Sequence, residues 1–305
     1  MRVVSLLPSA TEIVYALGVE PVATSHECDY PPQAAALPSV VTSRIDATAS
    51  SAEIDRQVLD TEASGGVYEL DRDTLADADP DVIIAQGICE VCAVDTGVVE
   101  SAIDELELDC ELVTTDPHSL DDILDDVERI GAALGREREA ATVVSRLRSR
   151  VDRVAAVASE ATDRPSVAIL DWLDPVMVAG HWVPELVELA GGRYGLADTR
   201  DASTPREWDE ISEYDPDVLV AAPCGFELDQ TFENLDDLTG RDGFDDLRAV
   251  RSGRAYAMDG HHLVNRPGPR VVDTLEALAG LLHPELFETP DESFARALVG
   301  APACR

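Results

Sequence analysis

The sequence predicts an α/β protein of two Rossmann-like lobes, each with a central parallel sheet, joined by a long helical connector. Three observations lead to this prediction. Short apolar runs that are typical of buried strands alternate with helical segments in both halves of the chain. A long helical stretch without strands separates the halves, and a helix–turn–strand pattern in the first half recurs in the second.

The first half alternates strands and helices, which favours a parallel sheet. Pro8 and Ser9 follow the first apolar run and suit the first turn of a helix, and Gly18 suits its end. We place this first lobe at residues 1–118. Its predicted strands are residues 2–7, 21–25, 81–85 and 110–115.

The connector is predicted from apolar residues that recur at helical spacing from Ser119 to about residue 160, with a break at Gly135. At about 1.5 Å per residue, such a stretch is long enough to link two lobes. We therefore assign residues 119–160 to connecting helices.

The second lobe is placed at residues 161–305. Its predicted strands are residues 166–170, 217–222 and 254–258. The repeated pattern is centred on Pro80 and Pro216, each within Asp-Pro-Asp, where a helix ends and a buried strand begins. Because open parallel sheets bind ligands beyond the carboxyl ends of their strands, two facing lobes predict a ligand cleft between them.

The charge balance is extreme, with 61 acidic residues against 23 basic ones, a net charge of −38 and no lysine. A field of this sign disfavours nucleic acid and anionic membranes as partners. The acidic residues are dispersed along the chain, which predicts a halophilic protein that its carboxylates keep hydrated in concentrated salt. We expect a monomer.

The beginning of the chain does not read as a secretory signal, because Pro8 and Glu12 interrupt a short apolar run. No stretch approaches the roughly 18 apolar residues of a membrane span, and six cysteines in 305 residues indicate reduced thiols. The sequence as it stands therefore predicts a cytoplasmic protein. A signal encoded upstream would instead place the protein at the extracytoplasmic surface.

The cysteines are the sharpest candidate metal site. Cys89 and Cys92 form a Cys-x-x-Cys after a predicted strand, Cys28 follows another strand beside His26, and Cys224 follows a strand of the second lobe. In parallel sheets these loops open at one edge, so the thiolates are candidate ligands of a metal such as zinc. Two alternatives remain open: the thiols fill loop cores as small apolar side chains, or Cys89 and Cys92 form a redox pair.

The sequence contains none of the common catalytic motifs that we searched for. The chain contains no G-x-S-x-G, no P-loop and no G-x-G-x-x-G after a strand. We therefore predict a binding protein that is not an enzyme and has no obligatory cofactor.

Four segments, in order, resemble the periplasmic cobalamin-binding proteins of vitamin B12 ABC importers and their relatives that bind iron-siderophores and haem. These segments are residues 2–12, 28–32, 79–83 and 265–270. The resemblance implies two lobes joined by a rigid helix, a corrinoid or related metal chelate between them, and an ABC permease as partner. By position, it also implies that Asp73 and Asp209 dock onto permease arginines, and the alternative is that both are solvated surface carboxylates.

The cleft departs from the cobalamin binders, which pack aromatic side chains on the corrin ring. Glu27 and Gln86 stand where aromatics are expected, whereas Trp172 fits an aromatic wall and Trp182 adds to it. His181 is a candidate metal ligand or a helix cap, and Arg266 a partner for a ligand carboxylate or phosphate, or for a neighbouring acid of the protein. The candidate ligand-binding residues are Pro8, Ser9, His26, Glu27, Cys28, Gln86, Trp172, His181, Trp182, His262 and Arg266.

The favoured function is thus that of a substrate-binding protein of an ABC importer. Two alternatives use the cysteines. One is a cytosolic metal-binding protein with cysteine ligands on the same fold, and the other is a thiol redox enzyme.

Overall fold

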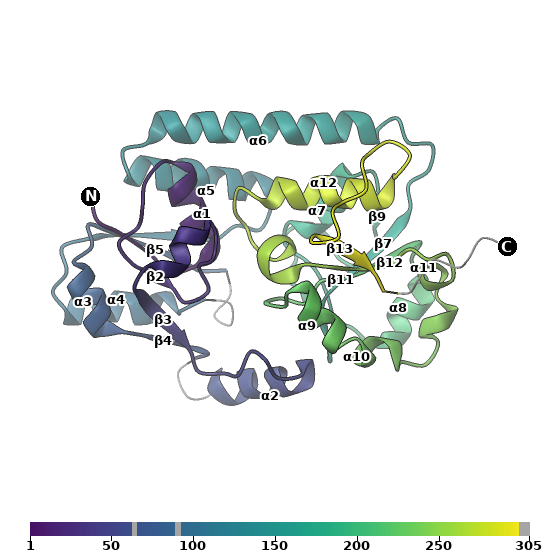
Figure 1. The fold of residues 1–305 in the computed structure, drawn as a ribbon, viewed down its shortest axis with the longest axis horizontal. Helices are drawn as coiled ribbons and strands as arrows, with labels where there is room; N and C mark the ends of the chain where they lie inside the picture. The colour runs from purple at the N-terminus through teal and green to yellow at the C-terminus, as the bar shows by residue number, and fades with distance from the viewer. Residues whose placement is uncertain (63–65, 89–92, 299–305) are drawn as a thin grey trace.

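The computed structural model describes residues 1–62, 66–88 and 93–298. Two α/β lobes lie side by side, and the long helix α6 runs along one edge of the molecule across both of them (Figure 1). The predicted fold class, two Rossmann-like lobes with a helical connector, is confirmed. Among the described residues, no helix combines the length and the apolar character needed to cross a membrane.

The first lobe is built on a parallel sheet in the order β1-β5-β6. A second sheet in the order β2-β3-β4 continues it through one bridge between Val4 and Ala23, and only its outer strand β4 is antiparallel. The strands are β1 (Val3–Ser5), β2 (Thr24–Ser25), β3 (Ser39–Ser43), β4 (Tyr68–Leu70), β5 (Val82–Gln86) and β6 (Glu111–Thr115). The helices are α1 (Pro8–Ala16), η1 (Pro32–Ala36), α2 (Ser51–Glu62), α3 (Arg72–Ala78) and α4 (Thr96–Glu105).

The second lobe has a parallel centre, β7-β11-β12, flanked by antiparallel strands in the order β10-β8-β7-β11-β12-β13, while β9 pairs with the start of β7. The strands are β7 (Ser166–Leu173), β8 (Val176–Val178), β9 (Arg193–Tyr194), β10 (Thr204–Pro205), β11 (Val218–Ala221), β12 (Ala255–Met258) and β13 (Ala295–Ala297). The helices are α7 (Val183–Leu189), α8 (Trp208–Tyr214), α9 (Leu228–Glu233), α10 (Asp236–Thr239), η2 (Phe244–Asp246), α11 (Arg248–Arg251), η3 (Gly260–Val264) and α12 (Val271–Leu282).

Two helices connect the lobes, α5 (Leu120–Ala133) and α6 (Glu137–Ala158). Gly135 lies between them with φ of +63°, a conformation that glycine adopts without steric cost. The 22 residues of α6 span about 33 Å, which is enough to reach from one lobe to the other. The buried face of α6 repeats at helical spacing and consists of Ala140, Val143, Val144, Leu147, Val154 and Ala158.

The Asp-Pro-Asp repeat has the same backbone geometry in both lobes. Helix α3 ends at Asp79 with φ of 41° and ψ of 63°, and α8 ends at Asp215 with φ of 43° and ψ of 68°. Each left-handed cap reverses the chain into a fully buried strand, β5 or β11. Such matching is what two copies of one α/β unit would give.

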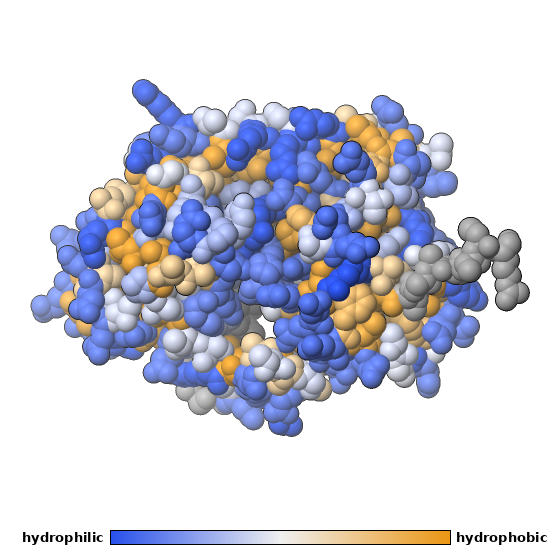
Figure 2. Space-filling view, in the orientation of Figure 1, coloured by the Kyte–Doolittle hydropathy of each residue, from blue (hydrophilic) through white to orange (hydrophobic). Residues whose placement is uncertain are grey.

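The apolar core joins the lobes into one body. One buried cluster includes Val3 and Ile84 of the first lobe, Leu147 of α6, and Val220 and Leu275 of the second lobe. The surface, by contrast, is coloured mainly as hydrophilic, including the seam where the lobes meet in this view (Figure 2). Hydrogen bonds and ion pairs join the lobes across this seam, which contains the candidate site.

Candidate functional site

The lobes meet through side chains at the centre of the seam, which we call the central network. Its members from the first lobe lie on α1 and on the loop after β2, and those from the second lobe lie on η3 and the loop after it. The members are Glu12, Asp29, Asp259, His261, His262, Arg266 and Arg270.

The second lobe presents its histidines on a π-helical turn, η3, directly after β12. Gly260 begins the turn so close to the preceding loop that a Cβ there would lie 2.0 Å from the carbonyl oxygen of Pro223, so only glycine fits. The Asp259 carboxylate accepts a hydrogen bond from the backbone N–H of His262 at 2.6 Å and caps the turn. Single π-helical turns occur frequently at functional sites.

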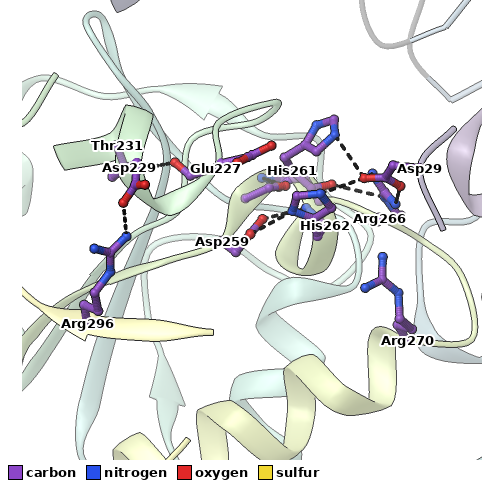
Figure 3. A network of polar contacts seen from close by, with 12 residues as sticks. Asp29, Glu227, Asp229, Thr231, Asp259, His261, His262, Arg266, Arg270 and Arg296 are labelled. Carbon is purple, nitrogen blue, oxygen red and sulfur yellow. Dashed lines mark hydrogen bonds and ion pairs between the residues drawn. The ribbon is translucent and has the colours of Figure 1, made fainter. Parts of the chain in front are cut away.

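Asp29 of the first lobe faces both histidines (Figure 3). Its Oδ2 lies 2.6 Å from His262 Nε2 and 3.5 Å from His261 Nε2. The other nitrogen of His262, Nδ1, lies 2.8 Å from Asp259 Oδ2. His262 is thus held between a carboxylate of each lobe, and it donates to both when it carries a proton on each nitrogen.

Arg266, on the loop after η3, links the two lobes beside the histidines. It is 4% exposed, and its Nη1 donates to Asp29 Oδ1 at 2.6 Å and to Glu12 Oε1 at 3.0 Å. Glu12, itself 3% exposed, also accepts from Arg270 Nη2 at 2.7 Å. Two guanidinium groups of the second lobe thus neutralise a buried carboxylate of the first.

Hydrogen bonds in the central network keep Asp29 and His262 charged. Burial would raise the pKa of Asp29, but hydrogen bonds from His261, His262 and Arg266 hold that pKa well below its usual range. Hydrogen bonds to Asp259 and Asp29 raise the pKa of His262 to about 9. At neutral pH, His262 is therefore an imidazolium that bridges the two lobes.

A small cavity opens beside this network at the carboxyl edge of the second sheet. Its volume is about 170 Å³, and Gly225, Glu227, Gln230 and His261 line it. A drug-sized ligand commonly occupies a pocket of about 300–1,000 Å³, so this cavity admits only a small group. A larger hollow of about 470 Å³ lies at the opposite end of the second lobe, beside Ser166 at the start of β7, and is not part of the seam.

Two further groups of contacts close the seam on either side of the central network. Near the connector, His118 Nδ1 lies 3.2 Å from His181 Nδ1, and Arg200 Nη2 donates to Asp122 Oδ1 at 3.1 Å. At the rim, the segment that enters α2 reaches the second lobe. There Gln230 Nε2 donates to Ala47 O at 2.6 Å and Ser51 Oγ to Asp237 Oδ2 at 2.5 Å.

The predicted ligand residues are divided among these places. His262 and Arg266 belong to the central network. Ser9 lies beneath it, since a Cβ at Gly268 would contact the Ser9 backbone at 3.4 Å, and the neighbouring Pro8 begins α1. His181 belongs to the contact near the connector, where burial and then the neighbouring His118 lower its pKa.

His26, Glu27 and Gln86 stay on the first lobe. His26 Nε2 lies 3.7 Å from Glu27 Oε1, which accepts from Tyr68 OH at 3.3 Å. Gln86 ends β5 and is 7% exposed. Among the described residues, the hydrogen bonds and ion pairs of these three side chains do not reach the central network.

The tryptophans do not form the expected aromatic wall. Trp172 is half-buried and packs edge-on against Phe226, with ring centroids 5.2 Å apart. Trp182 is 5% exposed, is part of the apolar core and donates through Nε1 to Val264 O. Placing Trp182 in the cleft wall is therefore wrong: its position at the start of α7 turns the indole into the second lobe.

Cys28 and Cys224, the two candidate cysteines among the described residues, do not form a common ligand group. Cys28 is 2% exposed with Sγ 3.1 Å from Thr11 Oγ1, and burial raises the pKa of its thiol to about 11. In residues 1–62, 66–88 and 93–298, the one cluster of three metal-ligating side chains is Asp29, His261 and His262, and neither Cys28 nor Cys224 belongs to it. Cys89 and Cys92 lie outside the described residues, so the thiolate site that includes them stays a prediction.

Comparison with known proteins identifies the family. A model of the periplasmic binding protein family matches residues 3–261. The chain belongs to this family. The lipoprotein YvrC of Bacillus subtilis, named as an ABC transporter substrate-binding protein, is 25% identical to this periplasmic binding protein over 297 residues, covering 94% of this chain and 81% of the relative.

Solved structures share the fold of this periplasmic binding protein. A periplasmic haem-binding protein of Pseudomonas aeruginosa superposes with a TM-score of 0.74 at 22% identity, covering 99% of each chain. The vitamin B12-binding protein BtuF of Vibrio cholerae superposes with a TM-score of 0.67 at 21% identity, covering 93% of this chain and 96% of its own. At these identities the likeness establishes the two-lobed fold.

The expected cytoplasmic location is wrong. The family is one of periplasmic binding proteins, and the Bacillus subtilis relative is a lipoprotein. The expectation rested on an apolar run too short for a signal and on a cysteine content that indicated reduced thiols, and neither observation determines where a protein acts.

Several residues of the central network were missed from the sequence. Asp29, Asp259 and Glu12 were not among the candidates, and of the adjacent histidines only His262 was named. Asp29 and Glu12 do lie within the segments that carry the family resemblance, and His261 precedes another. The signal that could have found them is charge complementarity between the acidic residues of the first two segments and the basic residues of the last one.

Proposed function

We propose that this protein is the substrate-binding component of an ABC importer and that its cargo is a metal chelate held between the lobes. The central network supports the proposal most directly, because charged and imidazole groups of both lobes converge at the carboxyl edges of their sheets. The relatives named for haem, vitamin B12 and ABC transport support the same class of cargo. The function is capture and release and involves no catalysis.

The composition of the seam bears on which chelate is bound. A corrinoid or haem gains much of its affinity from aromatic and apolar surface, whereas this seam presents carboxylates, imidazoles and guanidinium groups. A chelate with polar groups at its periphery, such as an iron-siderophore, fits such a lining better than a corrin ring does. Cobalamin remains the specific candidate that the sequence resemblance implies.

Binding a chelate requires the lobes to part. The cavity of about 170 Å³ is too small for a tetrapyrrole, and the central network occupies the space between the facing loops. Opening would break the contacts of Asp29 and Glu12 with the second lobe, while α6 and the core around it stay intact. Ligand groups that replace those contacts would close the lobes again.

Asp73 and Asp209 are placed suitably for docking to a permease. Both carboxylates are exposed and lie in the first turns of α3 and α8. A helix that leads into a parallel strand begins at the edge where the strands end, so both lie toward the cleft edge of their lobes. Figure 1 shows the two helices on opposite flanks of the molecule, as two docking points on a membrane protein would require.

The cargo test is a titration of purified protein with cyanocobalamin, haemin and a ferric hydroxamate siderophore, followed by ligand absorbance and tryptophan fluorescence. We expect saturable binding of one class with a dissociation constant in the micromolar range or below. The proposal fails if none of the three shows saturation at tens of micromolar.

The docking test uses Asp73→Arg and Asp209→Arg, with Asp77→Arg as the control because Asp77 is an exposed acid on the same helix as Asp73. We expect unchanged cargo affinity in all three variants and reduced cellular uptake only in the first two. Uptake equal to that of the Asp77→Arg variant would contradict docking through these carboxylates.

A further inference from the structure

One cluster in the seam has the composition of a metal site. The ligand atoms of Asp29, His261 and His262 all lie within 4.8 Å of one another. Two imidazoles and one carboxylate suit transition metals such as zinc, iron, cobalt and nickel better than they suit calcium or magnesium. Asp29 comes from the first lobe and both histidines from the second, so the cluster exists only when the lobes are closed.

We propose that Asp29, His261 and His262 bind one divalent transition-metal ion across the two closed lobes, as a bare ion or in a complex with a chelator small enough for the adjoining cavity. The proposal rests on the proposed function in taking the seam as the cargo site. It adds the atoms that would hold the metal.

The distances allow coordination after a small adjustment. Ligand atoms bonded to zinc at about 2.0–2.1 Å lie about 3.3 Å apart in a tetrahedral site. His261 Nε2 and Asp29 Oδ2, at 3.5 Å, already match this spacing. His262 Nε2 and Asp29 Oδ2 are a hydrogen-bonded pair at 2.6 Å, so the ion would replace the shared proton, which leaves to solvent, and spread the two atoms by about 0.7 Å.

The surroundings also suit a metal. His262 Nδ1 lies 2.8 Å from Asp259 Oδ2, and a metal-bound histidine almost always donates its other N–H to such a group, which fixes the ring and its tautomer. With neutral histidines, the carboxylates of Glu12, Asp29 and Asp259 outnumber the guanidinium groups of Arg266 and Arg270 by one. The net charge of −38 further attracts cations.

Three protein ligands leave an open coordination position, as in sites that accept an external ligand. The cavity beside His261 provides the space, and Glu227 and Gln230 line it with polar atoms. Figure 3 shows Glu227 on the same side of the seam as His261. Water would complete the shell of a bare ion, and donor atoms of the chelator would complete that of a chelate.

The test measures Zn²⁺ binding by calorimetry and Co²⁺ binding by visible absorbance in about 0.5 M KCl, which screens surface carboxylates. The protein carries Cys89→Ser and Cys92→Ser, so that no Cys-x-x-Cys contributes. We expect one ion per chain, and at least about 100-fold weaker binding in His261→Gln and Asp29→Asn. His26→Gln is the matched control, since His26 is a partly exposed histidine of the first lobe outside the cluster.

His261→Gln is the most informative variant, because among the described residues the ion pair of the His261 ring is the one with Asp29, at 3.5 Å. Its unfolding midpoint without metal should change little, because His262 and Arg266 still hold Asp29, and the variant should lose the rise in midpoint that Zn²⁺ gives the parent. Parental Zn²⁺ affinity in both His261→Gln and Asp29→Asn would overturn the metal site.

The two proposals fail separately. If a chelate binds but Zn²⁺ does not, and His261→Gln leaves chelate affinity unchanged, the metal site is wrong and the proposed function stands. If Zn²⁺ binds through the cluster while cobalamin, haem and siderophore do not bind, the source is the bare ion and the chelate proposal is wrong.

Discussion

Replacing Arg266 with methionine removes the buried charge that ties the lobes together. The side chain is 4% exposed and donates to carboxylates on two elements of the first lobe, Glu12 on α1 and Asp29 on the loop after β2. Methionine keeps most of the aliphatic volume and none of the charge. The substitution therefore tests the ion pairs with little change in packing.

The expected loss in the free energy of unfolding follows from the carboxylates that remain buried without Arg266. Glu12 keeps Arg270 as a partner but stays 3% exposed, with its Oε2 accepting no hydrogen bond among the described residues. Asp29 keeps His262. Removing one partner of a buried ion pair costs about 3–5 kcal/mol, a large part of the 5–15 kcal/mol that typically stabilises a protein. Because both carboxylates keep one partner, we expect Arg266→Met to lower the free energy of unfolding by about 3 kcal/mol, the lower end of this range.

The assay is urea unfolding followed by tryptophan fluorescence and circular dichroism at neutral pH. Arg148→Met is the control, because Arg148 forms a 2.8 Å ion pair with Asp121 in which both side chains are at least half exposed, and such pairs contribute about 0–1 kcal/mol. Adding Glu12→Gln to Arg266→Met should restore part of the loss, since it removes the stranded charge. Equal losses in Arg266→Met and Arg148→Met would refute the reasoning.

Three further predictions concern other parts of the molecule. Burial raises the pKa of Asp126 on α5 to about 7, against the opposing effect of Arg129. The contribution of Asp126 to the free energy of unfolding is therefore most favourable below pH 3.8 and is lost as pH rises through 7. Asp126→Asn should raise the free energy of unfolding by as much as about 4 kcal/mol at pH 8 and hardly change it at pH 4. The control Asp125→Asn, at an exposed position of the same helix, should show no such difference. Because the acidic residues are dispersed, we expect the unfolding midpoint to rise by several degrees between about 0.1 and 2 M KCl, as the Debye length shortens to a few ångströms. An unfolding midpoint that calorimetry finds independent of KCl would contradict a halophilic protein. Cys28, with its buried high-pKa thiol, should resist brief alkylation at pH 8 in native protein and react in urea, as mass spectrometry of the peptide would report.

Local patterns were sufficient to predict the fold. The apolar run at 81–85 corresponds to β5 at Val82–Gln86, and the connector at 119–160 contains α5 and α6, with Gly135 between them. These features depend on residues near in sequence: helical spacing, a glycine stop, and a proline that ends a helix and starts a strand. Short edge strands such as β9 and β10, with two residues each, carry no such periodicity and were not predicted.

The site could be predicted only in part, because its contacts join distant parts of the chain. Glu12 and Arg266 are 254 residues apart, and no local pattern pairs them. The sequence offered the right residue types at the right sheet edge, including His262 and Arg266. It could not show that Trp182 turns into the core or that Asp29 reaches across the seam, since both depend on how the two lobes pack.

The size of the cleft and the charge of the central network together constrain the cargo. A tetrapyrrole must separate the lobes and break the contacts of Arg266, so its apparent affinity carries the cost of opening. A bare ion held by Asp29 and His261 needs the lobes closed. Arg266→Met should therefore tighten binding of a large chelate by destabilising the closed form, and weaken binding of Zn²⁺ for the same reason. Measured by calorimetry on one protein sample, the sign of the change distinguishes the two kinds of cargo, and no change for either ligand would mean that Arg266 does not control closure.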